Sequence, residues 1–440
     1  MLVKKKDMTN SIINRNILVN KKLIDYVFSI FFFFILCFPQ TFYAIKILLM
    51  CVFIVFLLLD IKKSKLRISN EVFGLILIIL LFNLFYILLG QFRNYPAIKY
   101  YFLTHIAWIL FYGLLCFKID LDSFFTILRT ILSSSIFIYI MGIIAAILFN
   151  FFGFAEFAMF GANRRPGYPL VVISGGVIVN IIFSSPIILI MSILNGKKKY
   201  CIPLMILFVI FTSRRAIMLN LAFSPFICFF LLSFVKEKSD RRKYNNLYLK
   251  ILFILLLVIV AMLIVDISSP KINFIEYIVF VKNAFEFSRT IDNNIDEGGY
   301  LRALQFRSLM DGWKEHLFLG HGTAANASVI RSDTIPGAYE LTYIALLFQR
   351  GLLGFIVYFL QLSYIIFNLF YYSLKYRRIR NFLISILTGF ICFLIANGTN
   401  PYLEAFDHIW ILFFPLVVIN LIKKDPIKFI QKYDHYNTNS

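Results

Sequence analysis

The chain has 440 residues, of which 60% are hydrophobic and only 15% charged, and its mean hydropathy is +0.82. A soluble domain is far less apolar, and many apolar windows here reach the ~20 residues needed to cross a bilayer core. These values exclude a soluble multi-domain protein and indicate an all-α integral membrane protein. The formal net charge of +21 is then explained by basic cytoplasmic loops, so we expect no nucleic-acid partner.

The apolar segments predict about twelve transmembrane helices. The first segment follows a basic, polar start without a small-residue cleavage site, so we expect a retained span and not a removed signal peptide. The segment at 200–212 is the shortest and the least certain to span. The twelve segments lie near residues 23–38, 41–59, 72–90, 100–117, 131–152, 170–195, 200–212, 216–235, 249–267, 352–373, 381–397 and 409–423.

Basic connections fix the expected orientation. Nearly every second connection is rich in Lys and Arg, as in "KKSKLR", "GKKK", "KEKSDRRK", "KYRRIR" and "KKDPIK". By the positive-inside rule these connections and both termini are cytoplasmic. The predicted organisation is nine spans in 1–267, one large outer loop in 268–340, and an entry helix with three spans in 341–440. The connection at 118–130 is expected on the cytoplasmic side, although it is only weakly basic.

The outer loop at 268–340 is far longer than the other outer connections. Loops of this length usually carry function. Its sequence reads as partly helical, with the run "YLRALQFRSLMDGWKEHLFLGHG" after a Gly-Gly break.

Arginines on the outer side are not explained by topology, because the positive-inside rule disfavours them there. The planar guanidinium group grips phosphate or carboxylate at two points and stays charged at any relevant pH. We therefore expect a binding site outside the membrane for an anionic substrate that carries phosphate. For a single arginine, pairing with an acidic residue or with lipid phosphate remains an alternative. The candidate arginines are Arg164 and Arg165 in a Gly/Pro turn, Arg214 and Arg215 between two short apolar segments, Arg302 and Arg307 in the outer loop, and Arg350 at the mouth of a late span. Helical spacing places Arg302 and Arg307 on different faces, so we expect only one of them to reach the site.

Several of these stretches together resemble the O-antigen ligase and polymerase superfamily. The run from Arg302 to "LFLGHG" is similar to its outer-loop signature, although Leu317 stands where the family often has proline. "SRR" at 213–215, Arg164 or Arg165 with Gly167, and "RGLLGFIVYFL" at 350–360 resemble further family motifs in the right order. The resemblance implies a GT-C-like glycosyltransferase in the bacterial inner membrane. It would transfer glycan from undecaprenyl diphosphate outside the membrane. Basic residues would hold the diphosphate, without a metal or another cofactor.

Within this family, ligases carry a histidine some eleven residues before the glycine turn of the late span, and that position here is Glu340. A carboxylate can also accept the proton of an attacking sugar hydroxyl, so we predict Glu340 as the catalytic base, with His316 and His321 as the fallback bases. A salt bridge or a helix cap is the alternative for Glu340. Tyr339 is a candidate for stacking on a sugar, although tyrosines also collect at membrane interfaces.

The missing histidine favours the polymerase branch, in which the acceptor is a second lipid-linked oligosaccharide. Membrane lipids, a chain-length regulator and a flippase are the other partners that such an enzyme would have. Two alternatives remain: a ligase that joins finished polymer to lipid A core, and a flippase or other transporter of lipid-linked oligosaccharide. A transporter of this size should show related halves or polar residues at the midplane, and the sequence shows no such symmetry.

Overall fold

The computed structural model describes residues 23–39, 41–61, 68–152, 175–195, 200–212, 215–235, 297–331 and 335–439. These residues are helical apart from turns and connections, and no strand occurs among them. The all-α class predicted from composition is confirmed for this part of the chain.

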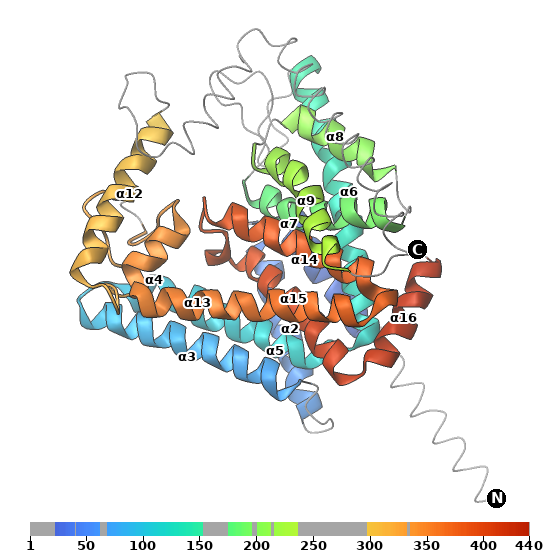
Figure 1. The fold of residues 1–440 in the computed structure, drawn as a ribbon, viewed down its shortest axis with the longest axis horizontal. Helices are drawn as coiled ribbons and strands as arrows, with labels where there is room; N and C mark the ends of the chain where they lie inside the picture. Colours follow the sequence, from blue (N-terminus) through green and yellow to red (C-terminus); the bar gives the residue numbers. More distant parts are fainter. Residues whose placement is uncertain are drawn as a thin grey trace, which may run out of the picture.

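The first described helix, Leu23–Cys37, is apolar. The elements that follow are labelled in Figure 1, except the short helices η1, η3 and η4. They are α2 (Tyr43–Ile61), α3 (Asn70–Phe92), α4 (Ala97–Phe102), the π-helix η1 (Leu103–Ala107), α5 (Trp108–Lys118), α6 (Leu121–Phe152), α7 (Gly175–Asn195), α8 (Cys201–Thr212), α9 (Arg215–Ser233), α12 (Glu297–Glu315), α13 (Thr342–Lys375), the 3-10 helix η3 (Arg377–Ile379), α14 (Arg380–Asn397), the 3-10 helix η4 (Tyr402–Glu404), α15 (Phe406–Lys424) and α16 (Pro426–Asn439).

Seven helices within the described ranges are long and apolar enough to cross a membrane, which identifies a multi-pass helical membrane protein. The predicted span at 249–267 lies outside the described residues. The predicted span at 200–212 is the helix α8, which has 12 residues. At 1.5 Å per residue the described part of this helix is about 18 Å long, and residues 213–214, which follow it, lie outside the description.

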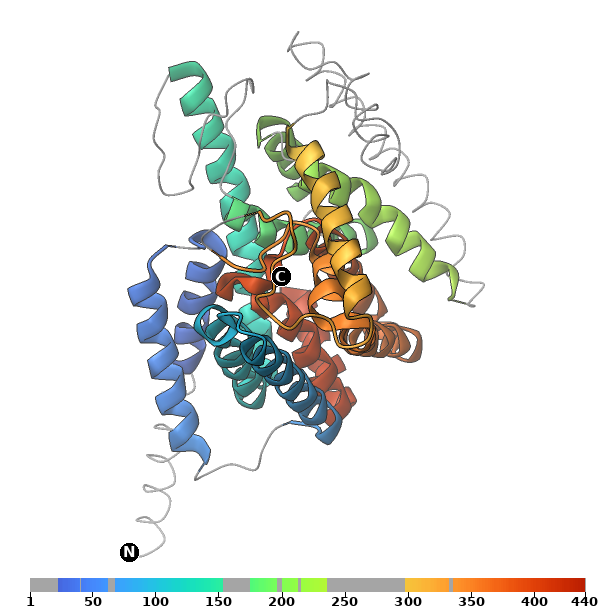
Figure 2. The same cartoon turned by 90° about the vertical axis from the view of Figure 1, so that its left-hand side faces the viewer.

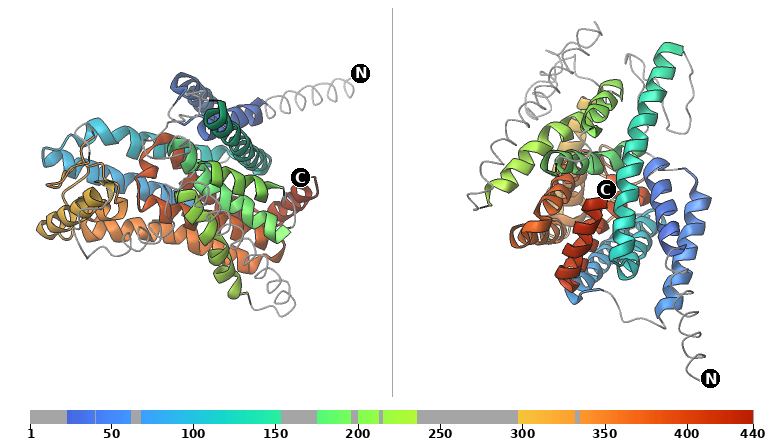
Figure 3. Two further views of the ribbon diagram at one scale, coloured as in Figure 1. Left: turned by 90° about the horizontal axis from the view of Figure 1, so that it is seen from above. Right: turned by 90° about the vertical axis from the view of Figure 1, so that its right-hand side faces the viewer.

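The helices alternate between two ends of one bundle. The loop end holds the connections at 92–97, 316–341 and 397–406, and the basic end holds those at 118–121, 375–380 and 424–426. Figure 1 shows α12 and α4 gathered at the loop end and α16 at the other, and Figure 2 shows α12 lying across the end that faces the viewer. The views in Figure 3 show the same separation of α12 from α16.

The connection predicted at 118–130 is mostly helical, because α6 already begins at Leu121. The Asp120 side chain explains the early start, since it accepts a hydrogen bond of 2.9 Å from the Ser123 N–H. A side-chain acceptor at this place satisfies a backbone N–H that the first turn of a helix leaves unpaired. Phe124 and Leu128 on the new turns are buried in the core.

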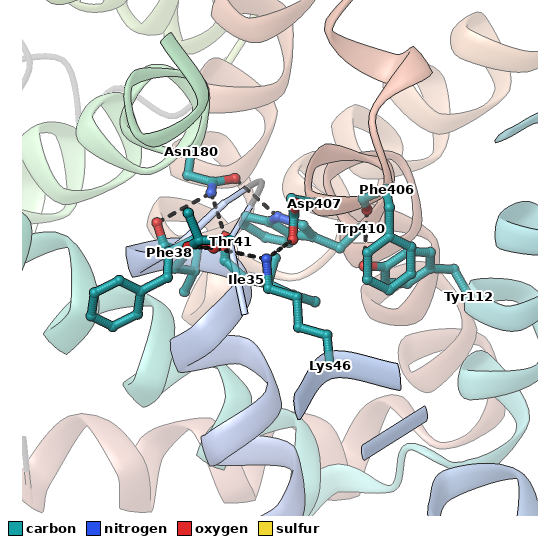
Figure 4. A network of polar contacts seen from close by, with 10 residues as sticks. Ile35, Phe38, Thr41, Lys46, Tyr112, Asn180, Phe406, Asp407 and Trp410 are labelled. Atoms are coloured by element: carbon teal, nitrogen blue, oxygen red, sulfur yellow. Dashed lines mark hydrogen bonds and ion pairs between the residues drawn. The ribbon is translucent and has the colours of Figure 1, made fainter. Parts of the chain in front are cut away.

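A buried ion pair joins α2 to α15 near the loop end, at the centre of the polar network in Figure 4. The Lys46 Nζ lies 2.6 Å from the Asp407 Oδ1, and the two side chains are 1% and 3% exposed. Lys46 also donates to the Phe38 carbonyl at 2.8 Å. Asn180 extends the network, since its Oδ1 accepts from the Trp410 indole N–H at 3.1 Å. Buried ionisable groups are costly unless they are paired. The ion pair therefore holds the start of α15 against the start of α2.

Candidate functional site

The helix α13 is broken at Gly351, close to its start. The backbone of Gly351 has φ 60° and ψ −171°, a conformation that only glycine adopts without strain. A Cβ atom there would lie 2.3 Å from the Phe318 carbonyl oxygen, and one on Gly320 would lie 2.4 Å from the Gly351 nitrogen. Two glycine-containing stretches that are about 30 residues apart in the sequence therefore pack backbone against backbone.

The turn at 317–323 is held on two sides by these close contacts. Backbone hydrogen bonds of 2.7–3.1 Å join residues 317–322 to residues 348–353 at the break. On the other side the Thr323 N–H donates to the Tyr86 carbonyl at 3.0 Å, and the Arg93 Nη1 donates to the Gly320 carbonyl at 2.6 Å. The outer-loop signature and the late-span motif are thus fixed to each other and to the end of α3.

Glu340 lies between two arginines at the loop end. Its Oε2 is 2.5 Å from the Arg302 Nε, and its Oε1 is 3.2 Å from the Arg331 Nη2. The Glu340 side chain is 23% exposed, whereas Arg307 is exposed on another face of α12. The arrangement brings α12, the segment after it and the start of α13 together around one carboxylate. Both of its oxygens are occupied, as the salt-bridge alternative from the sequence anticipates.

Arg350, the last residue before the break, is buried at 7% exposure. Its guanidinium carbon lies 5.7 Å from the centre of the Tyr86 ring. None of the described residues forms a hydrogen bond or an ion pair with this guanidinium. A buried guanidinium is costly when its N–H groups have no acceptor, so Arg350, whose donors meet none among the described residues, marks a place where an anion would be stabilised.

A second carboxyl group, Glu404, belongs to the same end and was not assigned a role from the sequence. It closes η4 in the short connection between α14 and α15. Burial raises the pKa of Glu404 to about 7, while the nearby positive charges of Arg350 and Arg331 lower it by less. The sequence feature that could have indicated Glu404 is the one that Glu340 shares: an acidic residue just before an apolar segment.

The other sequence-derived candidates lie elsewhere in the structure. Tyr339 is 2% exposed and its hydroxyl accepts a hydrogen bond of 2.6 Å from the Ala327 N–H, so its ring is part of the loop core. The His321 Nε2 lies 2.7 Å from the Gly312 carbonyl, and its ring stacks on that of Phe348 at 4.5 Å. These contacts hold the turn at 317–323 and the loop core in place.

The remaining predicted arginines cannot be placed in the site. Arg164, Arg165 and Arg214 lie outside the described residues. Arg215 is the first residue of α9, and its side chain is also outside the description.

Within the described residues, no group of three or more His, Cys, Asp or Glu side chains is placed to hold a metal ion. The candidate site consists of five residues at the loop end: Arg302, Arg331, Glu340, Arg350 and Glu404. Comparisons of the chain with family models, with curated proteins and with solved structures found no match.

Proposed function

We propose that the protein is a membrane glycosyltransferase that polymerises oligosaccharide repeat units carried on undecaprenyl diphosphate. The observation that supports the proposal is Arg350, a buried guanidinium without a protein acceptor among the described residues, at the same end of the bundle as Arg302 and Arg331. A diphosphate would supply the negative charge and the acceptor oxygens for the Arg350 guanidinium, in the two-point geometry that arginine favours.

The chemistry assigned to the site is a displacement at a sugar carbon. The donor glycan is attached to the diphosphate through its anomeric carbon, and the acceptor is a hydroxyl of a second lipid-linked unit. Guanidinium groups stabilise the charge that develops on the leaving diphosphate. A carboxylate accepts the proton of the attacking hydroxyl, which contributes typically ~10²–10⁴-fold to the rate. No step requires a metal ion.

The orientation follows from charge. The basic end carries most of the lysines and arginines of the described connections, including Lys375, Arg377, Arg378 and Lys424. By the positive-inside rule we place this end and both termini in the cytoplasm, and the loop end outside a bacterial inner membrane. The proposal retains about twelve spans and a GT-C-like arrangement, with a flippase and a chain-length regulator as partners.

Deletion of the gene followed by profiling of the surface glycan tests the proposal. We expect cells that carry a single repeat unit on the lipid core, because units are made and exported but not joined. Finished polymer that stays unattached would instead identify a ligase. Repeat units retained on the cytoplasmic face would identify a flippase, and an unchanged glycan would contradict all three activities.

A further inference from the structure

The loop end holds two carboxyl groups in different surroundings. Both oxygens of Glu340 are engaged, one by Arg302 and one by Arg331. Glu404 is half-buried, and none of the described residues donates a hydrogen bond to its carboxyl group or forms an ion pair with it. A substrate hydroxyl would have to displace a guanidinium group to reach Glu340, whereas no described residue occupies the Glu404 carboxyl group in this way.

We propose that Glu404 is the general base of the transfer reaction and that Glu340 is a positioning residue that sets the spacing of Arg302 and Arg331. The proposal rests on the glycosyl transfer proposed above and reassigns the base that the sequence placed at Glu340. It is carried by the contrast, at the same end of the bundle, between a carboxyl group that two arginines engage and one that no described residue engages.

Glu404 lies within electrostatic range of two guanidinium groups. Arg350 from α13 and Arg331 from the segment after α12 both act on it electrostatically. Tyr101 from α4 and Tyr358 from α13 also lie within electrostatic range of its carboxyl group. A diphosphate held by Arg350 and Arg331 would therefore lie within electrostatic range of Glu404, as the proposed role of this carboxyl group requires.

The short helix η4 that carries Glu404 is anchored on both sides. Before it, the fully buried Asn397 accepts a hydrogen bond of 3.2 Å from the Leu403 N–H through its Oδ1. After it, Asp407 is held by the buried ion pair with Lys46. A base must stay within hydrogen-bond reach of the proton that it accepts, and these anchors restrict the movement of Glu404.

The step balances without a further reactant. The oxygen of the acceptor hydroxyl forms a bond to the anomeric carbon of the donor as the bond from that carbon to the diphosphate oxygen breaks. The hydroxyl proton passes to the Glu404 carboxylate. The electron pair of the broken bond stays on the leaving diphosphate oxygen, and the arginines stabilise its charge. Release of the proton to the outer water restores the base.

The environment of Glu404 also sets an expected pH dependence. Burial raises the pKa of this carboxyl group to about 7, against the lowering influence of Arg350 and Arg331. The carboxylate form is the active base, so the rate should rise with pH below this value and level off above it. Below pH 7 the expected slope is about tenfold per pH unit, as for a single essential base.

The experiment uses the purified full-length protein in liposomes. The donor is the lipid-linked repeat unit extracted from cells that lack the gene, and the release of undecaprenyl diphosphate is followed between pH 5 and 9. We expect Glu404→Gln to lower kcat by ~10²-fold or more and to remove the rise of the rate with pH (the pH step). Glu404→Asp should retain part of the rate and the step. Glu340→Gln should raise the KM for the donor and keep the midpoint of the step, because it disturbs the arginines and leaves the base intact.

Controls separate the base from the fold and from the proposed activity. Glu315→Gln removes a carboxylate that is 70% exposed and should leave both rate and pH profile unchanged. Each variant is also tested for binding of undecaprenyl diphosphate, which Glu404→Gln should retain. The inference is overturned if Glu404→Gln keeps the wild-type rate and pH step, or if Glu340→Gln abolishes the step. A wild-type protein that releases no undecaprenyl diphosphate overturns the glycosyltransferase proposal itself.

Discussion

The buried pair of Lys46 and Asp407 gives a quantitative prediction about the loop end. At the observed separation of 2.6 Å, two unit charges attract by about 6 kcal/mol at an effective dielectric constant of ~20. The cost of removing both ions from water offsets much of this attraction. Replacing one partner alone leaves a buried charge without compensation, which typically costs ~3–5 kcal/mol. We therefore expect Lys46→Met and Asp407→Asn each to destabilise the protein by this amount.

The double variant should be more stable than Lys46→Met alone, because no unpaired charge remains. The assay is the free energy of unfolding in detergent for both single variants and the double variant, analysed as a double-mutant cycle. The exposed pair of Asp311 and Lys314, whose side chains are 71% and 68% exposed, is the matched control and should contribute only ~0–1 kcal/mol. Additive effects of the two single substitutions would refute the role of the pair.

Three further predictions concern the loop end. Gly351→Ala should open the turn at 317–323 to proteolysis, because the added Cβ meets a backbone carbonyl at 2.3 Å. The control Gly74→Ala, where an added Cβ meets nothing within 4 Å, should not open it. Arg350→Met should abolish binding of undecaprenyl diphosphate and raise the melting temperature of the free protein, since an unpaired buried charge is removed; a lower melting temperature would contradict this. Tyr101→Phe removes a hydrogen bond of 2.8 Å to the Pro336 carbonyl and should cost ~0.5–1.5 kcal/mol, measured as faster hydrogen exchange near residue 336.

Much of the fold could be predicted from periodicity and charge alone. The apolar segments coincide with helices wherever the structure describes them, because a span must satisfy its backbone hydrogen bonds internally. Element boundaries were harder to predict. The start of α6 depends on the cap provided by Asp120, and the break in α13 depends on Gly351 meeting a loop that is remote in the sequence.

The site was only partly predictable. Arg302 and Arg350 are predicted as arginines on the expected outer side and Glu340 from the family resemblance, and the structure places all three at the same end. Arg331 and Glu404 complete the cluster only through tertiary packing, in which the segment after α12 and the connection between α14 and α15 approach the start of α13. Sequence distance gives no indication of that proximity.

The most direct test of the central claim is reconstitution of the purified protein with a single lipid-linked oligosaccharide in liposomes, followed by mass spectrometry of the lipid-linked products. The account predicts products whose glycan masses increase by whole repeat units, with one undecaprenyl diphosphate released for each unit added. Donor that changes leaflet while its mass stays the same would contradict the account and indicate transport instead of glycosyl transfer.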